Sequence, residues 1–158
     1  MSEANTGGTA PGAEAPETKA SGPARLDAAG VQAYLDGSPC IAFSGLRVTA
    51  LDHDKQEITM RCPMRPEFER RAGSRQWHGG PLAFVIDTVG DFAVGMMVGR
   101  GLPTMNFRVD YLRPAIDTDL IVVAKVRRLG KTVGIADVDV FNEAGALLAI
   151  GRAAYATQ

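Results

Sequence analysis

The spacing of apolar and polar residues separates a short N-terminal stretch from a much longer region with regular periodicity. Residues 1–24 are rich in Ala, Gly, Pro, Thr, Ser and Glu, and Met1 is their one large apolar side chain. A segment of this kind buries too little apolar surface to offset the entropy that ordering would cost. We therefore expect a disordered tail over 1–24 and one folded domain over 25–158.

A short helix is expected to open the domain, because apolar residues recur at helical spacing after Asp27. Asp27 suits the N-cap position, since its side chain can accept a hydrogen bond from a backbone N–H of the first turn. Glycine at 37 and proline at 39 are expected to end the run. The residues expected on its buried face are Val31, Tyr34 and Leu35.

After this helix, the periodicity changes to one typical of β-strands, most clearly over 105–112, where apolar and polar residues alternate almost throughout. The predicted strands cover 41–51, 57–64, 105–112, 120–127, 132–141 and 146–155. Most of their connections are short and polar, as hairpins require, so the sheet is expected to be largely antiparallel. With one long helix between the second and third strands, the pattern predicts an α+β fold in which a curved antiparallel sheet surrounds that helix.

The long helix is predicted over 81–98, where Asp87 and Asp91 are the only charged residues. A helix that is apolar on all sides belongs in a protein interior. Each Asp near its middle would cost roughly 2.5–3.5 kcal/mol on membrane insertion, so we expect a buried core helix and no membrane span. A carboxylate carried into the core must be paired, hydrogen-bonded or placed at a cavity. Asp87 is thus either a structural partner of an arginine or a catalytic group, and the His-Gly-Gly just upstream favours catalysis.

Composition narrows the function further. Hydrophobic residues make up 46% of the chain and charged residues 22%, and the net charge of −1 gives no field that would attract nucleic acid or an anionic membrane. Cys40 and Cys62 lack metal-ligand or redox spacing, so we expect buried, inert thiols in a reducing compartment, and a cytoplasmic protein without a secretory signal. No cluster with metal-ligand spacing and no phosphate-binding loop is visible, so no metal site is expected.

Three motifs carry a resemblance to a known family. His78-Gly79-Gly80 is followed by Asp87, nine residues after the histidine. Thr104 precedes a predicted strand that ends in Tyr111-Leu112-Arg113-Pro114-Ala115, and a later turn reads Leu129-Gly130-Lys131-Thr132. With these motifs, residues 40–157 resemble the hotdog-fold acyl-CoA thioesterases of the PaaI-like branch, which includes phenylacetyl-CoA and hydroxybenzoyl-CoA thioesterases.

The resemblance implies hydrolysis of acyl-CoA thioesters, with CoA as part of the substrate and no separate cofactor. It implies that Asp87 attacks the thioester carbonyl or activates a water, and that the Gly79 N–H polarises the carbonyl oxygen. This is physically sound, because Gly79 would lie at the positive end of the helix that Pro81 is expected to begin. Thr104 would hold the water or the carboxylate, and His78 would shape the loop near the thioester.

Further residues are candidates for substrate binding. Gly80 adjoins the expected oxyanion donor. The family usually has Asn or Gln six residues before the histidine, where this chain has Ala72, and Gln76 is the nearest side chain able to replace it. Asp91 lies one turn after Asp87, so it is expected to raise one carboxyl pKa by repulsion, to contact the substrate, or to pair with a partner subunit's arginine.

A basic cluster at the turn between two predicted strands consists of Arg127, Arg128 and Lys131. Such a cluster is either a solvated hairpin end or a contact for the phosphates of CoA.

The resemblance also implies an oligomer, and two alternative functions stay open. By resemblance, we expect at least a homodimer with each active site between subunits, and a homotetramer built as a dimer of dimers. One rival function is a hotdog dehydratase or hydratase, which would use a His with a Glu or Asp as acid and base, and the tight spacing of His78 and Asp87 argues against it. The other is a non-catalytic acyl-CoA binding protein, which the missing Asn keeps open.

Overall fold

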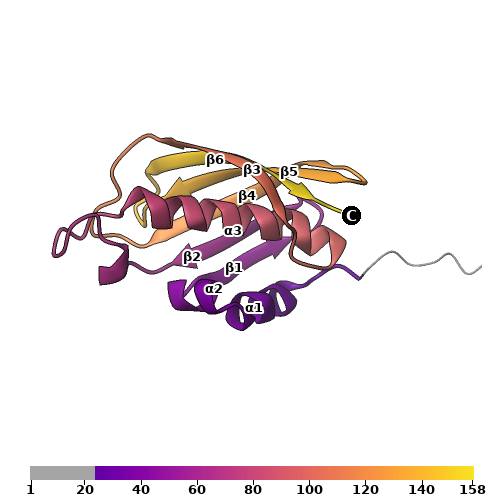
Figure 1. Ribbon diagram of the computed structural model, residues 1–158, viewed down its shortest axis with the longest axis horizontal. Coiled ribbons are helices and arrows are strands. Elements are labelled where there is room, and N and C mark those ends of the chain that lie inside the picture. The colour runs from indigo at the N-terminus through magenta and orange to yellow at the C-terminus, as the bar shows by residue number, and fades with distance from the viewer. Residues whose placement is uncertain (1–23) are drawn as a thin grey trace, which may run out of the picture.

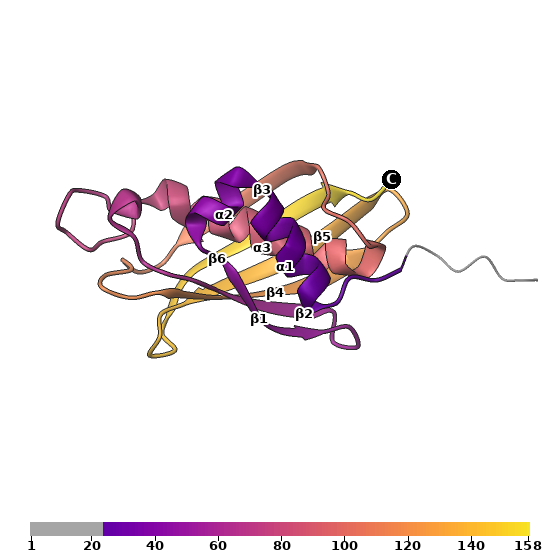
Figure 2. The same ribbon diagram turned by 90° about the horizontal axis from the view of Figure 1, so that it is seen from below.

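The computed structural model describes residues 24–158, so the predicted tail lies outside the described residues except for Ala24. Six strands form one antiparallel sheet that curves around the long helix α3 (Gly79–Val98) (Figure 1). Two shorter helices, α1 (Ala28–Gly37) and α2 (Pro39–Ser44), lie beside β1 (Arg47–Asp52) (Figure 2). The remaining elements are β2 (Glu57–Cys62), the 3-10 helix η1 (Pro66–Phe68), β3 (Thr104–Tyr111), β4 (Leu120–Leu129), β5 (Val133–Phe141) and β6 (Leu147–Ala156).

The sheet has the order β1-β2-β4-β5-β6-β3, and every neighbouring pair is antiparallel. Alternate residues of β4 and β5 are buried, because successive side chains of a strand point to opposite faces of the sheet, and these residues form the face that packs on α3. β3 lies at one edge of the sheet, although its chain neighbours in sequence are α3 and β4. The predicted α+β architecture is therefore confirmed.

The core is built on α3, which buries twelve of its twenty residues. By length and composition alone this helix could cross a membrane, with a mean hydropathy of 1.6. In the fold, 67% of that apolar window is buried inside the protein. The apolar surface of α3 thus packs on the concave face of the sheet.

The first helix agrees with its prediction. The Asp27 side chain accepts a hydrogen bond from the Gly30 N–H at 2.7 Å, and Val31 and Leu35 are buried. Tyr34 was expected on the same buried face, but 45% of it is exposed, and its ring lies at the rim of the core against Phe92.

The predicted strand over 41–51 is wrong in its first half. Residues 39–44 form α2, and β1 begins only at Arg47. Pro39 occupies the first helical turn, where its missing N–H costs no bond, and Gly45 ends the helix in a left-handed conformation (φ 74°). Cys40 consequently lies exposed on α2, against the expectation of a buried thiol. Cys62 is buried on β2, and burial raises the pKa of its thiol to about 12.

Candidate active site

The start of α3 differs by two residues from the prediction, because the helix begins at Gly79 and Pro81 is its third residue. The first four N–H groups of a helix have no intrahelical partner, so proline fits this position without losing a bond. His78 is the N-cap, and its Nδ1 accepts a hydrogen bond from the Gly80 N–H at 3.0 Å. His78 thus shapes the helix start, and the N–H of Gly80 is occupied by the cap.

Gly79 presents the group expected of an oxyanion donor. Its N–H makes no hydrogen bond within residues 24–158 and lies at the positive end of the α3 dipole. Its carbonyl oxygen accepts a hydrogen bond from the Tyr111 hydroxyl at 2.8 Å. A Cβ at this position would meet the Tyr111 ring at 3.2 Å, so this close contact suits glycine. The sequence motif contains Tyr111 but gave no role for it.

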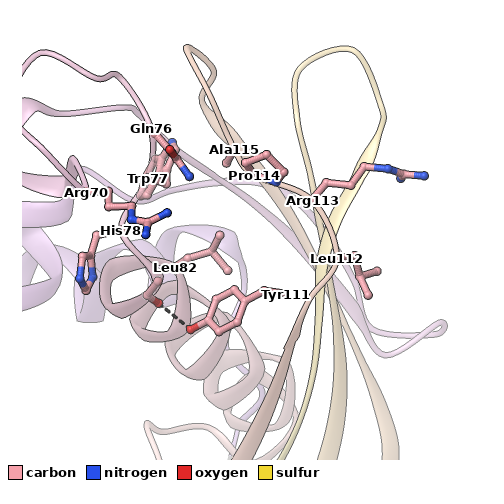
Figure 3. A pocket seen from close by; sticks show the side chains of 11 residues that line it. Arg70, Gln76, Trp77, His78, Leu82, Tyr111, Leu112, Arg113, Pro114 and Ala115 are labelled. Atoms are coloured by element: carbon pink, nitrogen blue, oxygen red, sulfur yellow. Dashed lines mark hydrogen bonds between the residues drawn. The ribbon is translucent and has the colours of Figure 1, made fainter.

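A cavity of about 360 Å³ opens beside Gly79. Its wall is fixed by backbone contacts, because the His78 N–H donates to the Phe68 carbonyl at 2.8 Å and the Trp77 N–H donates to the Ala115 carbonyl at 2.9 Å. Figure 3 shows Leu82 and Tyr111 on one side of this space, and Arg113 pointing away from it. The lining residues include Arg70, Gln76, Trp77, His78, Leu82 and Tyr111.

Gln76 therefore borders the cavity, as a replacement for the family's Asn or Gln would require. Ala72 lies exposed in the loop between η1 and α3. Its neighbour Gly73 donates its N–H to the Glu69 carboxylate, so this part of the loop is folded on itself.

Asp87 lies in the middle of α3 and is half-buried. The Thr104 hydroxyl, at the first residue of β3, donates a hydrogen bond to Asp87 Oδ1 at 2.9 Å. Burial raises the pKa of the Asp87 carboxyl, and the Thr104 hydrogen bond partly opposes this rise. Of the two contacts that the resemblance implies for Thr104, with the water or with the carboxylate, this structure contains the one with the carboxylate.

A second strand holds the same turn of the helix. Tyr155 on β6 pairs with Thr104 across the sheet, and its hydroxyl donates to the Asp87 carbonyl at 2.8 Å. Its ring is fully buried and crosses α3 at Gly90, where an added Cβ would lie 2.3 Å from the hydroxyl oxygen. The side-chain carboxylate and the backbone carbonyl of Asp87 are thus held by two neighbouring strands. The sequence analysis did not predict the contact with Tyr155.

Asp91 has a different environment from Asp87. Its Oδ1 accepts a hydrogen bond from the Leu102 N–H at 2.8 Å, in the turn between α3 and β3. Burial raises the pKa of Asp91 to about 7, with a further rise from the Asp87 charge, while the Leu102 N–H and Arg100 act in the opposite direction. The expected repulsion between the two carboxylates therefore raises the pKa of Asp91, but burial raises it more.

The fold does not bring the basic cluster to the helix start within one chain. Leu129, beside the cluster, pairs with Gly134, which packs on Val94 in the C-terminal half of α3. The cavity lies at the N-terminal end of the same helix. Arg127 also lies 3.3 Å from the Asp137 carboxylate. Arg127, Arg128 and Lys131 are thus near the opposite end of the sheet from Gly79.

Gly79 and Asp87 of one chain also cannot act on the same carbonyl group. They are eight residues apart, which corresponds to about 12 Å along a helix. The first N–H groups of a helix point out of its N-terminal end, away from the residues further along. A nucleophile must lie about 3–3.5 Å from the carbonyl carbon, and an oxyanion donor about 2.7–3.1 Å from its oxygen. A site that used both groups on one carbonyl would therefore need a second source for one of them.

No group of three or more His, Cys, Asp or Glu side chains within residues 24–158 is arranged to hold a metal ion. The chemical groups that the fold gathers are a carboxylate with a hydroxyl donor and, separately, a free N–H at a cavity.

Comparisons with known proteins bear on this arrangement. Residues 76–149 match the sequence profile of the thioesterase superfamily. A Halobacterium salinarum protein that bears the name of an esterase is 34% identical over 81% of this chain and 90% of its own length. Human acyl-coenzyme A thioesterase 13 is 33% identical over 58% of this chain and 67% of its own length, and Escherichia coli acyl-coenzyme A thioesterase PaaI is 26% identical over 76% and 83%.

Solved structures agree with the sequence matches. A crystal structure described as a protein from the thioesterase superfamily is 32% identical and has a TM-score of 0.77. The match covers 82% of this chain and 96% of that one. The E. coli PaaI structure, at 22% identity and a TM-score of 0.68, shares the fold. The expected hotdog fold is thereby confirmed.

Proposed function

Because this chain belongs to the thioesterase superfamily, we propose that it hydrolyses acyl-CoA thioesters to the free acid and CoA. The observation that carries the proposal is the state of Asp87. Thr104 holds one oxygen of its carboxylate, while the other, Oδ2, makes no hydrogen bond within the described residues. The carboxylate is thus oriented, desolvated in part, and free to act on a water or a carbonyl carbon.

In the proposed mechanism, Asp87 is the nucleophile or the general base. Its raised pKa makes the ionised carboxylate a stronger base than an exposed one, and general-base catalysis of this kind contributes about 10²–10⁴-fold. The Gly79 N–H binds the oxyanion that develops on the thioester oxygen, a contribution of about 2.7–4 kcal/mol for one donor. His78 and Tyr111 hold the peptide between Gly79 and Gly80, which follows the donor N–H directly, and Thr104 holds the Asp87 carboxylate.

We place each site between two subunits, so that Gly79 of one chain acts with Asp87 of a second copy. The 12 Å separation of these groups along one helix motivates the pairing, since each chain then supplies what the other lacks. β3 offers the surface for it, because it is a sheet edge with unpaired backbone groups and exposed apolar side chains. The exposed fractions are 58% for Met105, 43% for Phe107 and 55% for Tyr111.

The same arrangement divides the substrate between the two chains. The cavity beside Gly79 would receive the acyl group, whose carbonyl is bound at its mouth. The subunit that supplies Asp87 also carries the basic cluster toward the C-terminal half of its own α3. Arg127, Arg128 and Lys131 of that subunit are therefore the proposed contacts for the CoA phosphates, because charge-assisted bonds from Arg and Lys suit phosphate oxygens.

Release of free thiol from a panel of acyl-CoAs tests this function. Phenylacetyl-CoA, a medium-chain and a long-chain acyl-CoA are compared for the wild-type protein and for Asp87→Asn, which keeps the side-chain volume. We expect hydrolysis by the wild type and a loss of at least about a hundredfold in the variant. Equal turnover by a folded Asp87→Asn protein would remove Asp87 from the mechanism. Tight binding of acyl-CoA with no thiol release by either protein would identify a binding protein, and hydration of an enoyl-CoA would identify a hydratase.

A further inference from the structure

Asp91 is a partly buried carboxylate that the proposed reaction does not use. It lies one turn after Asp87 on the same face of α3, and its hydrogen-bond partner within the described residues is a backbone group, the Leu102 N–H at 2.8 Å. The charged or titratable groups around it are Asp87 on α3, Arg100 in the following turn and the Tyr155 hydroxyl on β6. Arg100 makes no ion pair with it within the described residues. The Asp91 carboxylate therefore binds the backbone of the turn and does not pair with a cation within the described residues.

This turn leads directly into the site. α3 ends at Val98, Gly99 reverses the chain in a left-handed conformation (φ 83°), and β3 begins at Thr104. The Leu102 side chain is buried, with 7% exposed, so the N–H that Asp91 binds belongs to an anchored residue. Two residues later, the Thr104 hydroxyl reaches back to Asp87. One helix turn thus contacts this segment twice, once through each carboxylate.

We propose that Asp91 is a positioning residue that sets the Thr104 hydroxyl against Asp87 by holding the backbone N–H of Leu102. The two carboxylates then have separate tasks, since Asp91 fixes where the segment returns to the helix and Asp87 receives the hydroxyl. Without the Leu102 anchor, the first residue of β3 is held by its pairing with Tyr155 and by the bond from the Ala156 N–H to the Pro103 carbonyl. Both of these contacts tie Thr104 to the sheet, whereas Asp91 ties it to α3. This inference rests on the proposed function, because it concerns the geometry of Asp87.

A double-mutant cycle separates positioning from the alternatives. Asp91→Leu keeps the branching and the number of side-chain heavy atoms, in a larger volume, and has no acceptor, whereas Asp91→Asn retains an oxygen for the Leu102 N–H and serves as the matched control. We expect Asp91→Leu to lower kcat about tenfold with little change in KM, and Asp91→Asn to stay within about threefold of wild type. In a Thr104→Val background, Asp91→Leu should cause almost no further loss, because the hydroxyl that it positions is gone.

Two results would overturn the proposal. Losses that multiply fully in the double variant would mean that Asp91 acts independently of Thr104. A rise in KM with unchanged kcat would mean that Asp91 contacts the substrate. If Asp91→Leu does not fold, Asp91→Ala replaces it in the same cycle.

A measurement that does not depend on catalysis, the pKa of Asp87, tests this proposal separately from the proposed function. The pKa of Asp87, followed by carboxyl NMR, should be higher in Asp91→Leu than in Asp91→Asn, because both variants lack the second charge and only the first loses the Thr104 hydrogen bond. Equal Asp87 pKa values in the two variants would contradict the positioning role, even in a protein that hydrolyses acyl-CoA. Absence of hydrolysis by the wild type would contradict the proposed function and leave this comparison intact.

Discussion

Replacing Asp91 by Asn should stabilise the protein at neutral pH and leave it unchanged in acid. Burial raises the pKa of Asp91 to about 7 from an ordinary value of 3.8. In the folded state the group is therefore protonated up to about pH 7, while in the unfolded chain it is ionised above about pH 4. Between these values the folded state binds the extra proton, so the free energy of unfolding falls as the pH rises.

The size of the effect follows from the same two values. At 1.36 kcal/mol for each pKa unit, the difference between 3.8 and about 7 corresponds to about 4 kcal/mol. The contribution of Asp91 is fully present below pH 4, is lost progressively up to about pH 7, and stays lost above it. Asn cannot ionise, and its side-chain oxygen can still accept the Leu102 hydrogen bond. The variant should therefore gain on the wild type by up to about 4 kcal/mol, with the whole gain reached near pH 7.

Urea unfolding of both proteins at pH values from 4 to 8 measures this difference. The protein concentration must be the same in every sample, because unfolding of an oligomer depends on concentration. The pKa of Asp87 is also raised, but that residue is present in both proteins, so the difference reports Asp91 together with its interaction with the Asp87 charge. A stability difference that does not change between pH 4 and pH 8, or one that favours the wild type at pH 8, would refute the claim that burial raises the pKa of Asp91.

Three further outcomes are expected. Thr104→Val should lower kcat about tenfold and move the acidic limb of the pH–activity profile to higher pH, because the Thr104 hydrogen bond lowers the pKa of Asp87 and its removal raises that pKa. Since the ionised form of Asp87 is the active one, an unmoved limb would contradict this contact. Arg128→Gln with Lys131→Gln should raise KM for acyl-CoA about tenfold and leave the KM of the matching acyl-pantetheine unchanged, and equal effects on both substrates would argue against phosphate contacts. Sedimentation at micromolar concentration should show a dimer or tetramer, also after deletion of residues 1–24, and a fully active monomer would exclude the shared site.

The main elements could be predicted because their signals are local, whereas the contact of Thr104 with Asp87, 17 residues earlier in the chain, was expected only from the family resemblance. Helix α3 is apolar on every side apart from two Asp residues, and residues 105–112 alternate apolar with polar side chains almost throughout. Helix α2 could not be predicted, since Ile41-Ala42-Phe43 is a short apolar run that fits a strand equally well. What decides its conformation is Pro39 at its start and Gly45 at its end.

Other features of the site depend on contacts between distant segments. The bond from the Leu102 N–H to Asp91 joins a backbone group to a side chain across a turn, and no residue type reports it. The contact of Tyr155 with Asp87 requires knowledge that β6 pairs with β3, although β6 is last in the chain. The N-terminal shift of α3 arises because His78 caps Gly80, which favours an earlier helix start than Pro81 alone suggests.

Subunit complementation tests the central claim, hydrolysis at a site formed by Gly79 of one chain and Asp87 of another. Gly79→Pro removes the proposed donor N–H at a helical position that proline tolerates, and the extended His78 backbone (φ −74°, ψ 145°) suits a residue before proline. Gly79→Ala carries the same added Cβ next to Tyr111 but keeps the N–H, so it controls for that 3.2 Å contact. Asp87→Asn is the complementary variant.

Each variant alone should be nearly inactive, and the two are then unfolded together, refolded and assayed for thiol release from acyl-CoA. Random pairing makes half of the dimers hybrid, and each hybrid has one site with both groups intact, so the account predicts recovery of about a quarter of the wild-type activity. A mixture that remains as inactive as its components, although hybrid dimers are shown to form, would contradict it.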